Sequence, residues 1–173
     1  MLGMNSGTLD AIPPHPGRTS PFNLINEWIG RNDYEPWDRL QLILDAIRLG
    51  LPRAVDSLRS IYDTVMATPP REETSDGALA AQTLEALHAV GKAPSLAELE
   101  HLALSATYNL ASGAVKLIAK GGRQIEAETL MRVYESVQSQ WLRSTILSVL
   151  EPLAGRLGLR ITQSEQKLTA LAI

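Results

Sequence analysis

The chain has 173 residues, 45% of them hydrophobic and 20% charged, which is enough to bury the core of one soluble globular domain. It contains no cysteine, which excludes disulfides, thiolate zinc sites and cysteine nucleophiles. Residues 1–111 carry 8 Lys and Arg against 14 Asp and Glu, whereas residues 112–173 carry 8 against 5. The basic surplus of the second part is too small to indicate a nucleic-acid ligand.

Residues 1–36 are predicted to form an N-terminal arm. Its first 20 residues hold several Pro and Gly and show no apolar period, which is typical of an extended segment. Ser20 and Pro21 then begin a short helix that ends at Gly30. A helix this short and apolar is marginal in water, so we expect it to dock on its own domain as a cap or on another chain as an anchor. The predicted partner-binding residues are Phe22, Ile25, Trp28 and Ile29.

Residues 37–158 are predicted to form an all-α domain. Apolar spacing predicts helices over residues 37–49, 53–66, 77–90, 95–107, 110–120, 125–138 and 140–157. Ser95 and Glu98 have the form of a capping box, and Pro152 predicts a kink near Ser148. Residues 159–173 are predicted as a C-terminal tail, with a short extended piece over 159–162 and at most weak helix beyond it.

Two consecutive helix pairs share one apolar template at a shift of 31 residues. The shift places Leu99, Leu102 and Ser105 on Leu130, Val133 and Ser136. It also places Leu110, Val115 and Ile118 on Trp141, Ile146 and Val149, and taken backwards on Leu79, Leu84 and Leu87. One helical hairpin per roughly 30 to 45 residues is the signature of an α-solenoid.

Residues 53–158 resemble the HEAT and armadillo class of helical repeats, and the segment 140–150 is most similar to the second helix of a HEAT unit. The Asp and Arg pattern of HEAT units is absent. The resemblance implies stacked antiparallel helical hairpins with long, shallow faces that bind partner segments. The alternative is a non-repetitive helical bundle, because all amphipathic helices share this apolar spacing.

Two Glu-x-x-His pairs, Glu85 with His88 and Glu98 with His101, are the candidate metal ligands. Each pair lies on one side of its helix, and the two pairs mirror each other about the intervening turn. Di-iron carboxylate bundles combine two such pairs with two further glutamates. The alternative is a pair of exposed contacts across a hairpin, and no cofactor is expected.

The sequence contains no glycine-rich phosphate loop, Gly-x-Ser-x-Gly elbow or His-Glu-x-x-His motif. We therefore predict a non-enzymatic, cytoplasmic protein–protein interaction module (an adaptor, chaperone or assembly subunit) that binds another protein or a second copy of itself, without a membrane. The helical aromatics Tyr62, Tyr108, Tyr134 and Trp141 fit a core as well as a groove. Nucleic-acid binding is the second hypothesis, and it requires one shared face for Lys116, Lys120, Arg123, Arg132, Arg143 and Arg156.

Overall fold

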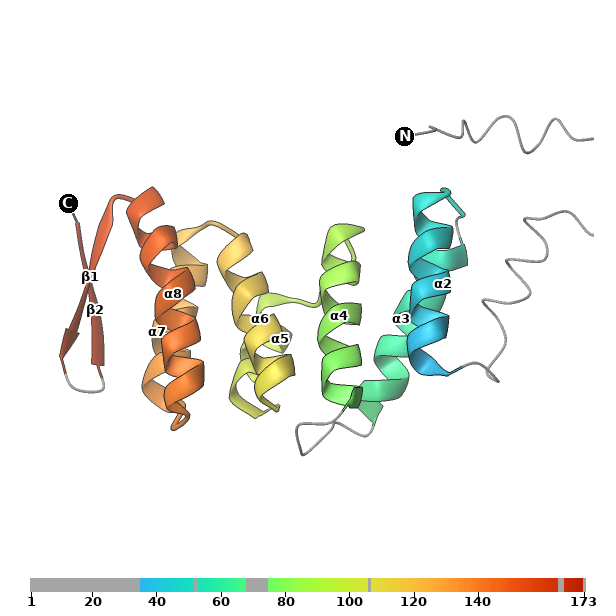
Figure 1. The fold of residues 1–173 in the computed structure, drawn as a ribbon. Helices are drawn as coiled ribbons and strands as arrows, with labels where there is room; N and C mark the ends of the chain where they lie inside the picture. The colour runs from blue at the N-terminus through green and yellow to red at the C-terminus, as the bar shows by residue number, and fades with distance from the viewer. Residues whose placement is uncertain (1–34, 52, 68–74, 106, 165–166, 173) are drawn as a thin grey trace, which may run out of the picture. The chain divides into compact units, whose positions relative to one another are not determined.

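The structure is a computed structural model that describes residues 35–172, except for residues 52, 68–74, 106 and 165–166. The predicted arm helix, with Phe22, Ile25, Trp28 and Ile29, lies outside the described residues. Within them the fold is all-α, as predicted, with seven helices and one two-stranded sheet (Figure 1). The chain divides into two compact units, one up to Thr64 and the other from Val65 onward.

The first unit contains α2 (Pro36–Arg48) and most of α3 (Arg53–Ala67). Each helix buries one stripe of side chains at helical spacing, which is the signal that predicted it. The stripe of α2 consists of Leu40, Ile43 and Ala46, and that of α3 includes Ala54, Leu58 and Ile61. Gly50 ends α2 at a φ of 77°, a left-handed conformation that glycine adopts without strain.

The second unit is built from two layers of helices. Its helices are α4 (Ser75–Ala89), α5 (Leu96–Ser105), α6 (Tyr108–Lys120), α7 (Gln124–Ser136) and α8 (Gln140–Arg156). In one layer α4 packs against α6 and α6 against α8, and in the other α5 packs against α7 (Figure 1). The layers are joined by the hairpins α5–α6 and α7–α8. Because α6 has neighbours on several sides, it is buried along most of its length.

The connection within the second hairpin is one residue longer than that within the first. Residues 106–107 join α5 to α6, whereas residues 137–139 join α7 to α8. The second helices are therefore related by a shift of 32 residues, which matches the buried residues Leu110, Ala114 and Ile118 with Leu142, Ile146 and Leu150. The predicted match of Leu110 with Trp141 is wrong, since Trp141 is 77% exposed and Leu142 takes the core position.

Side chains that accept backbone hydrogen bonds fix two of the helix starts. The predicted capping box at α5 is confirmed: Ser95 Oγ accepts from the Glu98 N–H at 3.3 Å, and Glu98 Oε2 accepts from the Ser95 N–H at 2.8 Å. At α8, Ser139 Oγ accepts from the Leu142 N–H at 3.3 Å. That helix continues as one element through Pro152.

A β-hairpin covers the end of the helical stack beyond α7 and α8. Strand β1 (Leu159–Ser164) packs on α8, and strand β2 (Lys167–Ala172) packs on α7 (Figure 1). The strands are antiparallel, with Leu159 opposite Ala172 and Ser164 opposite Lys167. Gln163 Nε2 donates to the Tyr134 hydroxyl oxygen at 2.7 Å, which ties β1 to α7. The prediction of weak helix beyond residue 162 is thus wrong.

None of the helices in the described part of the chain is both long and apolar enough to cross a membrane.

Candidate functional site

An exposed aromatic side chain stands on the α4–α6–α8 layer. Trp141, in the first turn of α8, is 77% exposed, more than any other large hydrophobic residue in the described ranges. Tyr108, in the first turn of α6, is 38% exposed. Both lie at the end of the unit where the two hairpins make their internal connections. The connectivity of the hairpins therefore places these rings at the same end.

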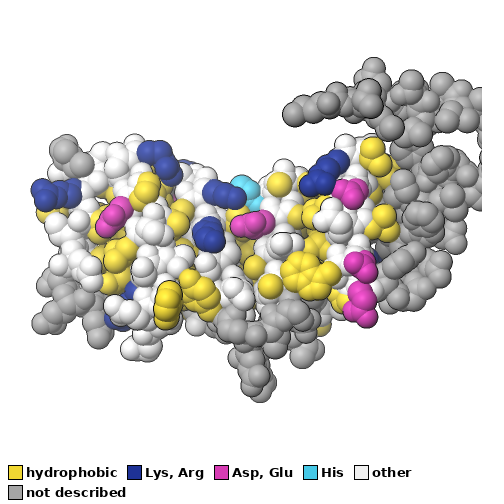
Figure 2. Space-filling view, viewed as in Figure 1, with side chains coloured by type: hydrophobic (Ala, Val, Ile, Leu, Met, Phe, Trp, Pro, Cys, Tyr) yellow, Lys and Arg dark blue, Asp and Glu magenta, His cyan; other side chains and the backbone are white. Residues whose placement is uncertain are grey.

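Hydrogen bonds hold Tyr108 against the helix that carries Trp141. The Tyr108 hydroxyl lies 3.1 Å from Thr145 Oγ1, and Thr145 Oγ1 donates to the Trp141 carbonyl oxygen at 3.1 Å. Leu104, in the last turn of α5, is exposed at the same end. We call Leu104, Tyr108 and Trp141 the aromatic surface. Figure 2 shows hydrophobic side chains reaching the surface in the lower half of the molecule, over α6 and α8.

Three of the six basic residues of the nucleic-acid hypothesis have partners within the fold. Arg132 on α7 donates two hydrogen bonds of 3.1 Å to the carboxylate of Glu100 on α5. Arg123 pairs with Glu126, and the Arg143 guanidinium lies 5.4 Å from the centre of the Tyr134 ring. The others, Lys116, Lys120 and Arg156, are exposed on α6 and α8. Arg132 belongs to the α5–α7 layer, so the six do not form one free cationic face.

The two Glu-x-x-His pairs do not come together as a metal site. Within the described residues no group of three or more His, Asp or Glu side chains is placed to hold a metal ion. The Glu98 carboxylate instead accepts the hydrogen bonds of Ser95 at the start of α5. Glu85, Glu98 and His101 are exposed, and His88 is half-buried. The metal hypothesis fails because one of its carboxylates serves as a helix cap.

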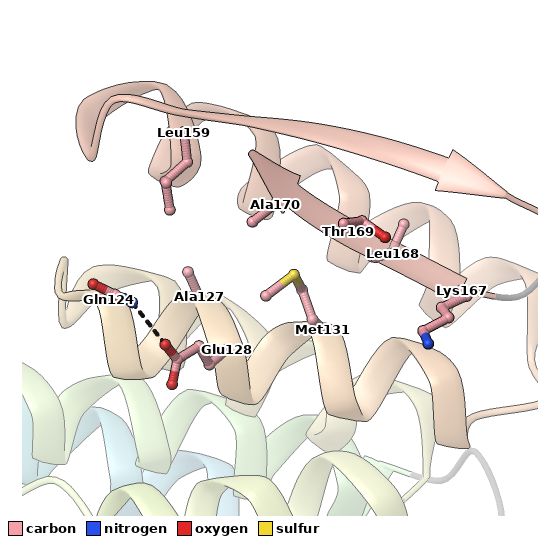
Figure 3. A pocket seen from close by; sticks show the side chains of 9 residues that line it. All are labelled: Gln124, Ala127, Glu128, Met131, Leu159, Lys167, Leu168, Thr169 and Ala170. Carbon is pink, nitrogen blue, oxygen red and sulfur yellow. Dashed lines mark hydrogen bonds between the residues drawn. The ribbon is translucent and has the colours of Figure 1, made fainter. Parts of the chain in front are cut away.

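A cavity of about 430 Å³ lies between α7 and β2 (Figure 3). The α7 wall consists of Gln124, Ala127, Glu128 and Met131. The opposite wall consists of residues 167–170 of β2, with Leu159 of β1 above them. Sequence reasoning missed this cavity because it did not predict β2, which forms half of it.

The start of α7 carries a buried carboxylate with an exposed cationic partner. Glu126 is 2% exposed, and it accepts from the Arg123 N–H at 3.0 Å and from Arg123 Nε at 2.9 Å. The hydrogen bonds from the Arg123 side chain lower the pKa of Glu126 below its ordinary value of 4.5, against the burial that raises it. The same pairing raises the pKa of Arg123.

This lowered pKa predicts a pH-dependent contribution to stability. Because the folded state holds Glu126 ionised more strongly than the unfolded chain does, the contribution is present above pH 4.5 and is lost as the pH falls through the folded-state pKa. We expect the stability difference between the wild type and Glu126→Gln to shrink over that acidic range, measured by urea unfolding at a series of pH values. Glu151→Gln, at an exposed position of α8, controls for loss of one negative charge. A difference for Glu126→Gln that stays constant with pH would contradict the assignment.

Comparison of the chain with protein-family models, curated proteins and solved structures found no match.

Proposed function

We propose that the protein is a non-enzymatic protein–protein interaction module, an adaptor, chaperone or assembly subunit, whose aromatic surface contacts another protein. The observation that carries the proposal is the 77% exposure of Trp141 in the first turn of a well-packed helix. Tryptophan and tyrosine are enriched among the residues that dominate binding energies at protein interfaces. The resemblance to HEAT and armadillo repeats and a cytoplasmic location belong to the same proposal.

The local structure favours binding because it holds the aromatic surface in place before a partner arrives. Trp141 is followed by the buried Leu142, and Tyr108 is tethered through its hydroxyl to Thr145. A side chain on a rigid element loses less conformational entropy on binding than one on a loop. Burial of a largely exposed tryptophan in a partner's pocket contributes about 2 kcal/mol or more.

The proposal is tested by quantitative affinity purification of the full chain from the cells that make it, followed by reconstitution with the purified partner. We expect Trp141→Ala to weaken the affinity of the reconstituted complex by at least about 30-fold, which corresponds to about 2 kcal/mol. Leu171→Ala is the matched control, since Leu171 is an exposed apolar residue, 52% exposed, on the β-hairpin. The control should leave the affinity unchanged.

Light scattering on the same variants identifies the case in which the partner is a second copy. A wild-type oligomer that becomes monomeric with Trp141→Ala would show self-association through the aromatic surface. A folded Trp141→Ala variant that keeps the full affinity for its partner would overturn the proposed contact.

A further inference from the structure

The cavity beside β2 borders the edge of a strand, not its face. Side chains of a strand alternate between its two faces, yet four consecutive residues, 167–170, line this cavity. In the described part of the chain β2 is paired along one edge only, with β1. The backbone N–H and C=O groups of its other edge are therefore open to hydrogen bonding. We call the cavity between this edge and α7 the edge groove.

The other wall of the edge groove is one stripe of α7. Gln124, Ala127, Glu128 and Met131 are spaced i, i+3, i+4 and i+7, so all four share one face of the helix. Figure 3 shows β2 running alongside α7 in the opposite direction, with the side chains of Ala127 and Met131 directed toward the strand. The groove is thus bounded by an open strand edge on one side and an apolar helix stripe on the other.

Charged groups mark the two ends of the edge groove. Glu128 lies at one end, where its carboxylate accepts from Gln124 Nε2 at 2.8 Å, and Lys167 lies at the other (Figure 3). Between them the lining is apolar, with Ala127, Met131 and Ala170. The volume of about 430 Å³ falls in the range of ligand sites.

We propose that the edge groove binds an extended segment of another protein, which adds to β2 as a third strand. Strand addition gains its affinity from main-chain hydrogen bonds and its specificity from the side-chain pockets beside the edge. Here the pockets select apolar side chains in the centre, a carboxylate opposite Lys167 and a cation opposite Glu128. This binding mode is independent of the aromatic surface.

The charges argue against a second copy of the chain as the occupant. Neither strand of the hairpin contains Asp or Glu: β1 is Leu-Arg-Ile-Thr-Gln-Ser and β2 is Lys-Leu-Thr-Ala-Leu-Ala. A hairpin strand from another copy would therefore place no carboxylate opposite Lys167. The segment must come from a chain with an acidic residue at one end of an apolar stretch.

The test uses two fluorescein-labelled peptides with capped ends, Asp-Val-Thr-Val-Thr-Val-Lys and its reverse, because the added strand can run in either direction. We expect one of them to bind the full chain saturably with a dissociation constant below about 1 mM. Amide chemical-shift changes should centre on residues 167–170 and the facing stripe of α7. N-methylation of alternate peptide amides should weaken binding at least about tenfold, because it removes main-chain hydrogen bonds.

The matched protein variants are Lys167→Glu in the groove and Lys116→Glu on α6, both at exposed positions. Lys167→Glu should weaken the preferred peptide about fivefold, and Lys116→Glu should leave it unchanged. The proposal is overturned if neither peptide saturates, if the N-methylated peptide binds equally well, or if the shifts map to α6 and α8. It is likewise overturned if light scattering shows that copies of the protein associate and that Thr169→Pro, which blocks the β2 edge, makes them monomeric.

Discussion

Leu142→Ala is expected to destabilise the protein by about 2–5 kcal/mol, the range for a buried leucine whose removal leaves a cavity. Leu142 is only 5% exposed, and with Ile146 and Leu150 it forms the stripe that α8 packs against α6 and α7. Its position equals that of Leu110 in the preceding hairpin once the longer connection is taken into account. The measurement is urea unfolding of the full chain, followed by circular dichroism.

The neighbouring substitution Trp141→Ala is the control for the same measurement. An exposed side chain contributes little to the folded state, so the change should stay within about 0.5 kcal/mol. Alanine also has the higher helix propensity, which favours the variant slightly. If Trp141→Ala were the more destabilising of the two, α8 would follow the shift of 31 residues with Trp141 in the core, and the aromatic surface would not exist.

The sequence predicted the helices because each carries a local signal. The stripe of Leu99 and Leu102 and the capping residues Ser95 and Glu98 fix α5 without knowledge of the rest of the chain. The exposure of Trp141 could not be predicted in the same way. It depends on one additional residue in a connection, which rotates α8 about its axis by roughly 100° relative to the predicted register.

The β-hairpin was missed because its local signals are weak. Glu165 and Gln166 stand between the strands, without the Asn-Gly or Asp-Gly pair that marks a two-residue turn. Strand β2 contains two leucines and two alanines, which favour helix in isolation. Packing of Leu168 against the end of the helical stack outweighs that preference, and such packing is visible only in three dimensions. The edge groove depends on β2 and was therefore unpredictable as well.

Gly121→Ala is expected to destabilise the protein by about 1–3 kcal/mol, the range for forcing extra volume into a packed site. The backbone of Gly121 has φ −60° and ψ −31°, which alanine adopts without strain. The cost arises from contact, since a Cβ at this position would lie 2.7 Å from Cγ and 2.8 Å from Cδ of Glu126. Glu126 is buried and bonded to Arg123, so it cannot move aside without losing those hydrogen bonds.

Gly155→Ala is the matched control, because Gly155 lies within α8 and a Cβ there would meet nothing within 4 Å. We expect this variant to be more stable than the wild type by up to about 1 kcal/mol, from helix propensity alone. A double-mutant cycle separates the contact from other effects: in the background of Glu126→Ala, which removes the atoms that clash, Gly121→Ala should cost much less. If Gly121→Ala were stabilising in the wild-type background, the packing of Glu126 against the end of α6 would be wrong.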